Sequence, residues 1–244
     1  MRYKIVIEYD GTGFVGFQRQ ENGLSIQQVI EDAIFSLSGK DVKIFASGRT
    51  DAGVHALGQV AHFDLDKFFS ENVIVGALNF YLKKFSVVIL SAEIVSDQFH
   101  ARFSARQRKY IYRIINRKAP LAIEKNRALH VKHMLNIDNM QKAADHLIGT
   151  HDFTSFRSSQ CQANSPVKTL DEIKIVQDLE TLTIEVTALS FLHHMIRNIS
   201  GTLIKVGIGK LSPDQIPEIL KSKNRSNAGP TAPPYALYFA HVKY

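Results

Sequence analysis

The order of apolar patterns over residues 2–95 constrains the fold more than any other feature of this sequence. Polar and apolar residues alternate over Arg2–Tyr9, which predicts a β-strand. Ser25 and Gln28 form a capping box ahead of apolar residues at helical spacing, which predicts a helix from Ser25. Two further strands, a second helix and a last buried strand are predicted at Lys43–Ala46, Gly58–Asp64, Glu71–Leu82 and Val87–Val95. The resulting order, β-α-β-β-α-β, is the ferredoxin-like arrangement.

The second half of the chain is predicted to repeat this order of elements, without useful sequence identity to the first half. The predicted elements are Arg108–Ile115, Asp138–Leu147, Leu170–Val176, Leu182–Ala188, Leu192–Val206, a short helix after Pro213, and Ala236–Val242. We therefore predict an α+β fold of two ferredoxin-like halves, with domains over residues 1–104 and 105–244. Antiparallel sheets with helices on one face would form one platform, with an active-site cleft between the halves.

The stretch ASGRTDAGVHALGQVAHF, residues 46–63, includes a polar segment that separates two of these predicted strands, Lys43–Ala46 and Gly58–Asp64. Arg49 and Asp51 are costly to bury unless they pair with each other or with a ligand. The segment is therefore either an ordinary loop with a surface ion pair or a polar site held between strands. In a site, Asp51 would be nucleophile or base, and a cation would have to keep it ionised under a substrate. Arg49 and Arg197 are the candidate cations.

A second notable segment is Gln98–Arg113, in which cations alternate with aromatic rings. Its members are Arg102, Arg106, Arg108, Lys109 and Arg113, with Phe99, Phe103, Tyr110 and Tyr112. Cations match phosphates and flat rings match bases, so the pattern indicates a nucleic-acid surface. The alternative is a solvated strand with its aromatic residues in the core. On a strand, Arg108, Tyr110 and Tyr112 share a face.

Composition narrows the classes of partner and compartment. The formal net charge of +7 favours an anionic partner, with nucleic acid ahead of a membrane surface. One cysteine, Cys161, excludes an intrachain disulfide and a Cys-based zinc cluster. No apolar run approaches the roughly 20 residues of a membrane span. We expect a cytoplasmic protein without a membrane segment.

Two other motifs invite interpretations that the sequence disfavours. Gly11, Gly13 and Gly16 spell a dinucleotide fingerprint, but the next predicted helix starts only near Ser25, so no helix N-terminus faces a pyrophosphate. His193 and His194 suggest a metal site, but neighbours on a helix point about 100° apart and are poor joint ligands. We expect neither a nicotinamide cofactor nor a metal.

Five blocks of this sequence resemble the tRNA pseudouridine synthase A family, almost from end to end and in the family's order. They are YDGTGFVGFQRQ at 9–20, GRTDAGVHALGQVAHF at 48–63, FHARFSARQRKYIYR at 99–113, DFTSF at 152–156 and FLHHMIRNISG at 191–201. The C-terminal AGPTAPPYALYF at 228–239 is also similar to that family. The resemblance implies an isomerase that converts uridine to pseudouridine in the anticodon stem-loop of tRNA, without metal or organic cofactor, as a homodimer.

The resemblance also implies roles for individual residues. Asp51 would be the catalytic aspartate, Tyr110 the ring that stacks on the target base, Arg49 a residue that helps to extrude it, and Arg197 the basic partner of Asp51. Substrate binding would involve Tyr110, Arg49, His55, Arg102, Arg106, Arg108 and Lys109. Flipping the nucleotide costs a few kcal/mol, which phosphate contacts and stacking must offset.

The sequence departs from the family pattern at two positions. Phe17 stands where relatives often have Trp, and Lys168 stands where Arg is frequent. A lysine cannot bind a phosphate through a planar fork, so one contact would be weaker. The rival interpretation is a non-catalytic RNA-binding module of the ferredoxin-like kind.

Overall fold

The computed structural model describes all residues from 1 to 244, and it is a mixed α+β structure with mostly antiparallel strands and five α-helices. The chain divides into two compact units. The N-terminal unit comprises Met1–Arg106 together with Tyr238–Tyr244, and the second unit comprises Gln107–Leu237. No helix has the length and apolar character that crossing a membrane would need.

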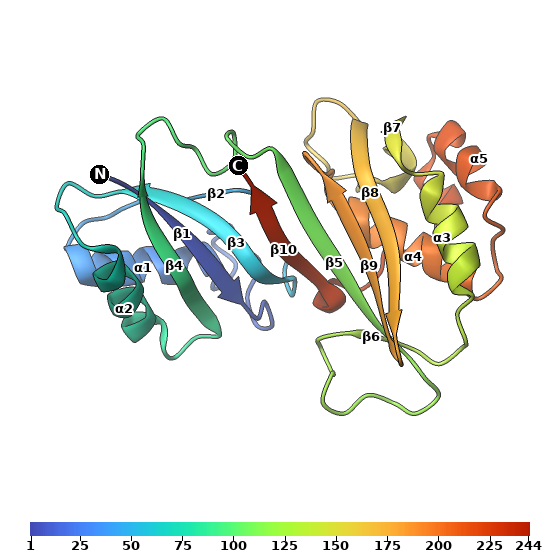
Figure 1. Cartoon of the computed structure of the whole chain (residues 1–244), viewed down its shortest axis with the longest axis horizontal. Coiled ribbons are helices and arrows are strands. Elements are labelled where there is room, and N and C mark those ends of the chain that lie inside the picture. The colour runs from blue at the N-terminus through green and yellow to red at the C-terminus, as the bar shows by residue number, and fades with distance from the viewer. The chain divides into compact units, whose positions relative to one another are not determined.

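The N-terminal unit follows the predicted order of elements over residues 2–95 (Figure 1). Its elements are β1 (Arg2–Tyr9), α1 (Ile26–Ser38), β2 (Phe45–Ala46), β3 (His55–Asp64), α2 (Glu71–Leu82), β4 (Val87–Val95) and β10 (Leu237–Lys243). The strands are ordered β4-β1-β3-β10, and β2 pairs with β3. β1 is antiparallel to both of its neighbours, whereas β10 runs parallel to β3.

Local sequence explains these elements. Tyr3, Ile5 and Ile7 alternate along β1 and are fully buried, so one face of the strand lies in the core. The side chain of Ser25 accepts a hydrogen bond from the Gln28 amide, which is the predicted N-cap of α1. α1 contacts α2, and α2 contacts β4 (Figure 1).

The second unit contains two strands that the sequence analysis did not predict. Its elements are β5 (Gln107–Asn116), β6 (Leu129–Val131), α3 (Ile137–Asp145), β7 (Gly149–Asp152), β8 (Val167–Asp178), β9 (Thr181–Ala188), α4 (Met195–Gly207) and α5 (Gln215–Ser222). The strand order is β5-β9-β8-β7, and β6 pairs in parallel with β5. β6 and β7 are only three and four residues long, too short for a visible period.

Several predicted boundaries are corrected by the structure, and two of these corrections affect segments next to candidate site residues. The strand expected at Lys43–Ala46 is reduced to Phe45–Ala46. The helix expected from Leu192 begins at Met195, because His194 has a left-handed backbone with φ of 62° and cannot continue a right-handed helix.

Candidate active site

The loop over Ser47–Val54, called the Asp51 loop from here on, connects β2 to β3 and is anchored at its start. Ser47 Oγ donates to Gln59 Oε1 at 2.6 Å, and Gln59 Nε2 donates to the Gly48 carbonyl at 2.9 Å. The Ser47 amide also donates to the Val60 carbonyl at 2.8 Å. Gln59 is fully buried on β3, so its two hydrogen bonds attach the start of the loop to the interior of the unit.

The middle of the Asp51 loop rests on the glycine run Gly11–Gly16. The Phe17 amide donates to the Thr50 carbonyl at 3.0 Å, and the Tyr9 hydroxyl lies 2.7 Å from Thr50 Oγ1. Gly16 has φ of 116°, and a Cβ there would lie 2.8 Å from the Thr50 carbonyl oxygen. Only glycine permits both this backbone and this approach. The glycine run therefore supports the neighbouring loop.

Two side chains strengthen this support from within the core. Burial raises the pKa of Tyr9 to about 12, so its hydroxyl stays protonated near neutral pH. The ring of Phe17, where relatives often have Trp, lies 6.2 Å from that of Tyr9, and both are buried. The first backbone amide of α1 is also used within the protein: the Ile26 amide donates a hydrogen bond to the Gly16 carbonyl at 3.2 Å.

Asp51 and Arg49 differ in their surroundings. Asp51 is half-buried, and its carbonyl accepts from the Val54 amide at 3.1 Å, which closes a turn. Arg49 is exposed, and no ion pair joins it to Asp51. An exposed guanidinium keeps its hydration without such a pair. The loop thus presents a partly shielded carboxylate and, two residues earlier, a solvated cation.

His55 follows the loop as the first residue of β3. It is 2% exposed, and its Nδ1 accepts from the Gly11 amide at 3.0 Å. The carboxylate of Asp10 lies 3.1 Å from the same nitrogen. The ring is 4.8 Å from that of Tyr238 on β10. His55, predicted to bind substrate, therefore connects the glycine run to β3 and has little surface to offer a ligand.

In the second unit, Arg108, Tyr110 and Tyr112 share one face of β5, as their spacing predicts, and all three are buried. Tyr110 is 9% exposed and meets Phe191 edge to face at 5.2 Å. The Tyr112 hydroxyl donates to the Pro233 carbonyl at 3.0 Å, and burial raises its pKa. The guanidinium of Arg108 donates to the Leu189 carbonyl. This face is a packed layer in which Tyr110 keeps a small exposed area.

Four of the five cations in the Gln98–Arg113 segment were also expected to bind substrate, and they occupy different environments. Arg102 and Arg106, in the N-terminal unit, are exposed. In the second unit, Arg108 is buried, and Lys109 Nζ lies 2.6 Å from Glu185 Oε2. Arg102 and Arg106 are therefore the cations of this set that a phosphate can reach from solvent, whereas Arg108 is enclosed and Lys109 is already bound to a carboxylate.

Arg197 lies in the first turns of α4 and is fixed by the segment before β10. Its Nε donates to the Ala232 carbonyl at 2.8 Å, and the Ala232 amide donates back to the Arg197 carbonyl at 3.1 Å. One turn later, Gly201 is in such close contact with the Pro230 carbonyl that a Cβ would collide with it. The segment Gly229–Pro233 therefore holds this end of α4 in place.

Asn198, which follows Arg197 on α4, is a buried polar residue that the sequence analysis did not single out. It is buried on α4, and its amide donates to the Phe156 carbonyl at 2.8 Å. Its Oδ1 accepts from Arg225 Nη2 at 2.9 Å and from Thr231 Oγ1 at 2.7 Å. An asparagine among the apolar residues of the predicted helix Leu192–Val206 was the available signal, because a buried amide needs several partners.

The two histidines before α4 lie closer together than predicted. Because His194 has a left-handed backbone, it is not a helical neighbour of His193, and the two ring centroids are 3.9 Å apart. The prediction that helical geometry makes these two rings poor joint ligands was therefore wrong, because His193 and His194 are not successive residues of a helix.

A family model described as tRNA pseudouridine synthase matches residues 5–104 and 143–244. The chain belongs to this family. It is 50% identical to tRNA pseudouridine synthase A of Ehrlichia chaffeensis over 245 residues, which cover 100% of both chains. It is 49% identical to the proteins of the same name from Ehrlichia canis and Ehrlichia ruminantium, again over 100% of both chains.

The search of solved structures gave a more distant likeness. The crystal structure of a Cbf5-Nop10-Gar1 complex contains a chain that aligns with 83% of this chain and 45% of its own length. The sequence identity is 12% and the TM-score is 0.35.

Proposed function

We propose that this tRNA pseudouridine synthase, an isomerase that converts uridine to pseudouridine, acts in the anticodon stem-loop of tRNA. The reaction breaks the bond between ribose C1′ and uracil N1 and forms one between C1′ and C5. The C5 proton is lost and N1 gains a proton, so no atom or electron is gained overall. The observation that carries the proposal is the end-to-end match to the family together with Asp51 on a loop fixed at Ser47, Thr50 and Val54.

Asp51 is the proposed catalytic residue, as nucleophile on the sugar or as base. A carboxylate that enters the chemistry must be held to within a fraction of an ångström of the reacting atom. The bonds to Thr50 from Tyr9 and Phe17 provide such support one residue away. The half-buried position also allows a bound nucleotide to complete the exclusion of water.

The remaining roles in this proposal follow the family resemblance. Arg49, exposed within the loop, would contact the extruded nucleotide. Tyr110, which keeps only a small exposed area, would offer that area to the target base. Arg197 would keep Asp51 ionised once a substrate excludes water. Arg102 and Arg106 would bind phosphates, because both are exposed.

The finer points of architecture and assembly belong to the same proposal. We infer that each half is ferredoxin-like, that the protein acts as a cytoplasmic homodimer, and that the reaction uses neither metal nor organic cofactor. The order β4-β1-β3 with β2 beside β3 supports this architecture for the first half. In the second half, β10 pairs with β3 in the N-terminal unit, so the closing strand lies outside the second unit.

Incubation of the full-length protein with unmodified tRNA transcripts, followed by position-resolved mapping of pseudouridine, tests the proposal. We expect product at uridines of the anticodon stem-loop. A filter-binding assay on the same transcripts is run in parallel. Binding without product would favour a non-catalytic RNA-binding module, and product confined to another part of the tRNA would contradict the proposed target.

A further inference from the structure

Four aromatic rings, called the ring patch from here on, lie together where β2 pairs with the last residues of β3. They belong to Phe45, His62, His100 and Phe103. Phe45 stacks on His62 with centroids 5.2 Å apart, and His100 lies 4.6 Å from His62. Phe103 extends the series, since its centroid is 4.4 Å from that of His100. All four residues belong to the N-terminal unit.

The two end rings of the patch are exposed, and each has a cation beside it. Phe103 is 76% exposed, and the guanidinium carbon of Arg102 lies 5.5 Å from its centroid. Phe45 is 43% exposed, and Lys43 Nζ lies 5.9 Å from its centroid. Exposing two large apolar rings to water costs free energy, and such exposed patches often mark binding sites. Exposed rings with adjacent cations are the arrangement that binds single-stranded nucleic acid.

The two histidines of the patch contribute neutral rings near pH 7. Burial lowers the pKa of His62 to about 4, with smaller effects from His100 and Arg2, and its Nδ1 accepts from the Ala101 amide at 3.2 Å. Burial also lowers the pKa of His100, followed by the charges of Arg2 and Arg102. Uncharged imidazoles join the phenylalanines into one aromatic surface, while the positive charge stays at its two ends.

His62, at the centre of the ring patch, lies far along β3 from the point where the Asp51 loop joins this strand. His55, the first residue of β3, follows the Asp51 loop directly, and His62 lies seven positions further along the strand. A strand rises about 3.3 Å per residue, which separates the two histidines by about 23 Å. A ligand on the ring patch is therefore a different part of the substrate from the target base.

We propose that the ring patch binds an unpaired nucleotide of the tRNA substrate, distinct from the target uridine. The base stacks on Phe103, and Arg102 and Lys43 contact the flanking phosphates. This inference rests on the proposed function, which supplies the polyanion. A second copy of this chain fits less well, because a symmetric contact through the same patch would bring Arg102 and Lys43 next to like charges.

Replacement of Phe103 tests the inference, with tRNA affinity and turnover measured separately. Phe103→Leu removes the ring and keeps apolar bulk at an exposed position, so folding should be unaffected. We expect the Kd for an unmodified tRNA transcript to rise about five- to a hundredfold, the range for loss of one stacked base. The rate at saturating tRNA should stay within about twofold, because the Asp51 loop is untouched. Phe103→Tyr keeps a ring face and should retain wild-type affinity.

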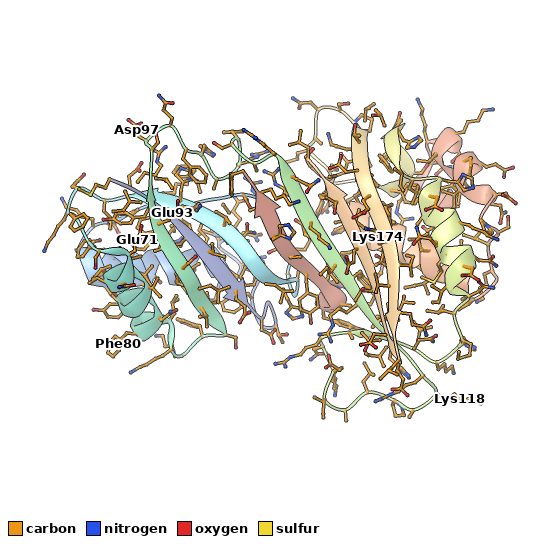
Figure 2. The ribbon with its side chains drawn as sticks, viewed as in Figure 1. Glu71, Phe80, Glu93, Asp97, Lys118 and Lys174 are labelled. Atoms are coloured by element: carbon orange, nitrogen blue, oxygen red, sulfur yellow. The ribbon has the colours of Figure 1, made fainter.

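Phe80 offers a matched control in the same unit (Figure 2). It is 61% exposed on α2, and Lys83 Nζ lies 4.6 Å from its centroid, but it is not part of the ring patch. Phe80→Leu should leave tRNA affinity unchanged. Equal Kd values for wild type and Phe103→Leu, or equal losses for Phe80→Leu and Phe103→Leu, would overturn the inference.

Light scattering and product mapping separate the remaining outcomes. If Phe103→Leu lowers the molecular mass in solution and leaves the Kd unchanged, the ring patch is a contact between copies of this chain and the inference is wrong. If wild type forms no pseudouridine, the proposed function fails, whereas the Kd comparison still decides whether the ring patch binds RNA. The two failures are therefore distinguishable.

Discussion

The Asp51 loop and the ring patch lie in the same unit but are built in opposite ways. The loop is held by hydrogen bonds from Ser47, Tyr9 and Phe17, and the glycine run approaches its backbone closely. The ring patch places Phe103 and Phe45 in solvent, with cations beside them. A fixed backbone suits a group that must meet a reacting atom, whereas an exposed, adaptable surface suits affinity. We therefore expect substitutions in the loop to change the rate and substitutions in the patch to change binding.

Replacement of Asp51 should show the loop's role with the largest effect. Asp51→Asn is nearly isosteric and removes the carboxylate that acts as nucleophile or base. We expect pseudouridine formation to fall by at least about a thousandfold, near the upper part of the range for loss of a catalytic acid or base. The Kd for tRNA should stay within about tenfold. Turnover that survives in this variant would remove Asp51 from the mechanism.

Gly16→Ala tests whether the glycine run holds the loop in place. The new Cβ would lie 2.8 Å from the Thr50 carbonyl oxygen at φ of 116°, so the loop must shift. A displacement of about 1 Å can cost about a hundredfold in rate, and we expect a loss of that order with an unchanged Kd. Gly13→Ala is the matched control, because Gly13 also has positive φ, of 83°, but nothing lies within 4 Å of the added atom. Equal rate losses in both variants would point to backbone strain alone.

Tyr9→Phe removes one hydroxyl below the loop and should have a smaller effect. Thr50 Oγ1 loses the partner at 2.7 Å, which should lower the free energy of unfolding by about 1–2 kcal/mol and the rate by up to about tenfold. Tyr3→Phe is the control on the same strand. Its hydroxyl bonds to the backbone of Phe69, so stability should fall similarly while the rate is retained. Denaturant unfolding and single-turnover rates measure both quantities.

The ring patch should show a dependence of stability on pH through His62. The pKa of His62 is lowered to about 4 in the folded protein, first by burial and then by His100 and Arg2, with Asp64 opposing. The unfolded chain, with a pKa near 6.5, binds the proton first, so stability should be full above about pH 6.5 and fall towards pH 4. The contribution lost is about 2–3 kcal/mol.

His62→Asn tests this dependence, because an amide oxygen can accept from the Ala101 amide without titrating. The free energy of unfolding of this variant should change less than that of wild type between pH 6.5 and 4. An unchanged slope would assign the titration to another group.

Local patterns were sufficient to predict the elements of residues 2–95 and the placement of the Asp51 loop between two of them. They could not predict contacts between distant segments. Tyr9 and Thr50, whose side chains are hydrogen-bonded, are 41 positions apart in the sequence. The pairing of Tyr238 with His55 also depends on β3 having an edge that no other strand covers, which local patterns do not show. Likewise, Arg108 had the same sequence signal as Arg102, and only the packing of β5 shows that one is buried and the other exposed.

Single-turnover pseudouridine formation as a function of tRNA concentration tests the contrast between the two regions most directly. It gives the plateau rate and the half-saturating concentration for one variant in each region. We expect Gly16→Ala to lower the plateau by about a hundredfold at an unchanged half-saturating concentration, and Phe103→Leu to raise that concentration about five- to a hundredfold at an unchanged plateau. If both variants changed both quantities to the same extent, the division between a rigid catalytic loop and an RNA-binding ring patch would be wrong.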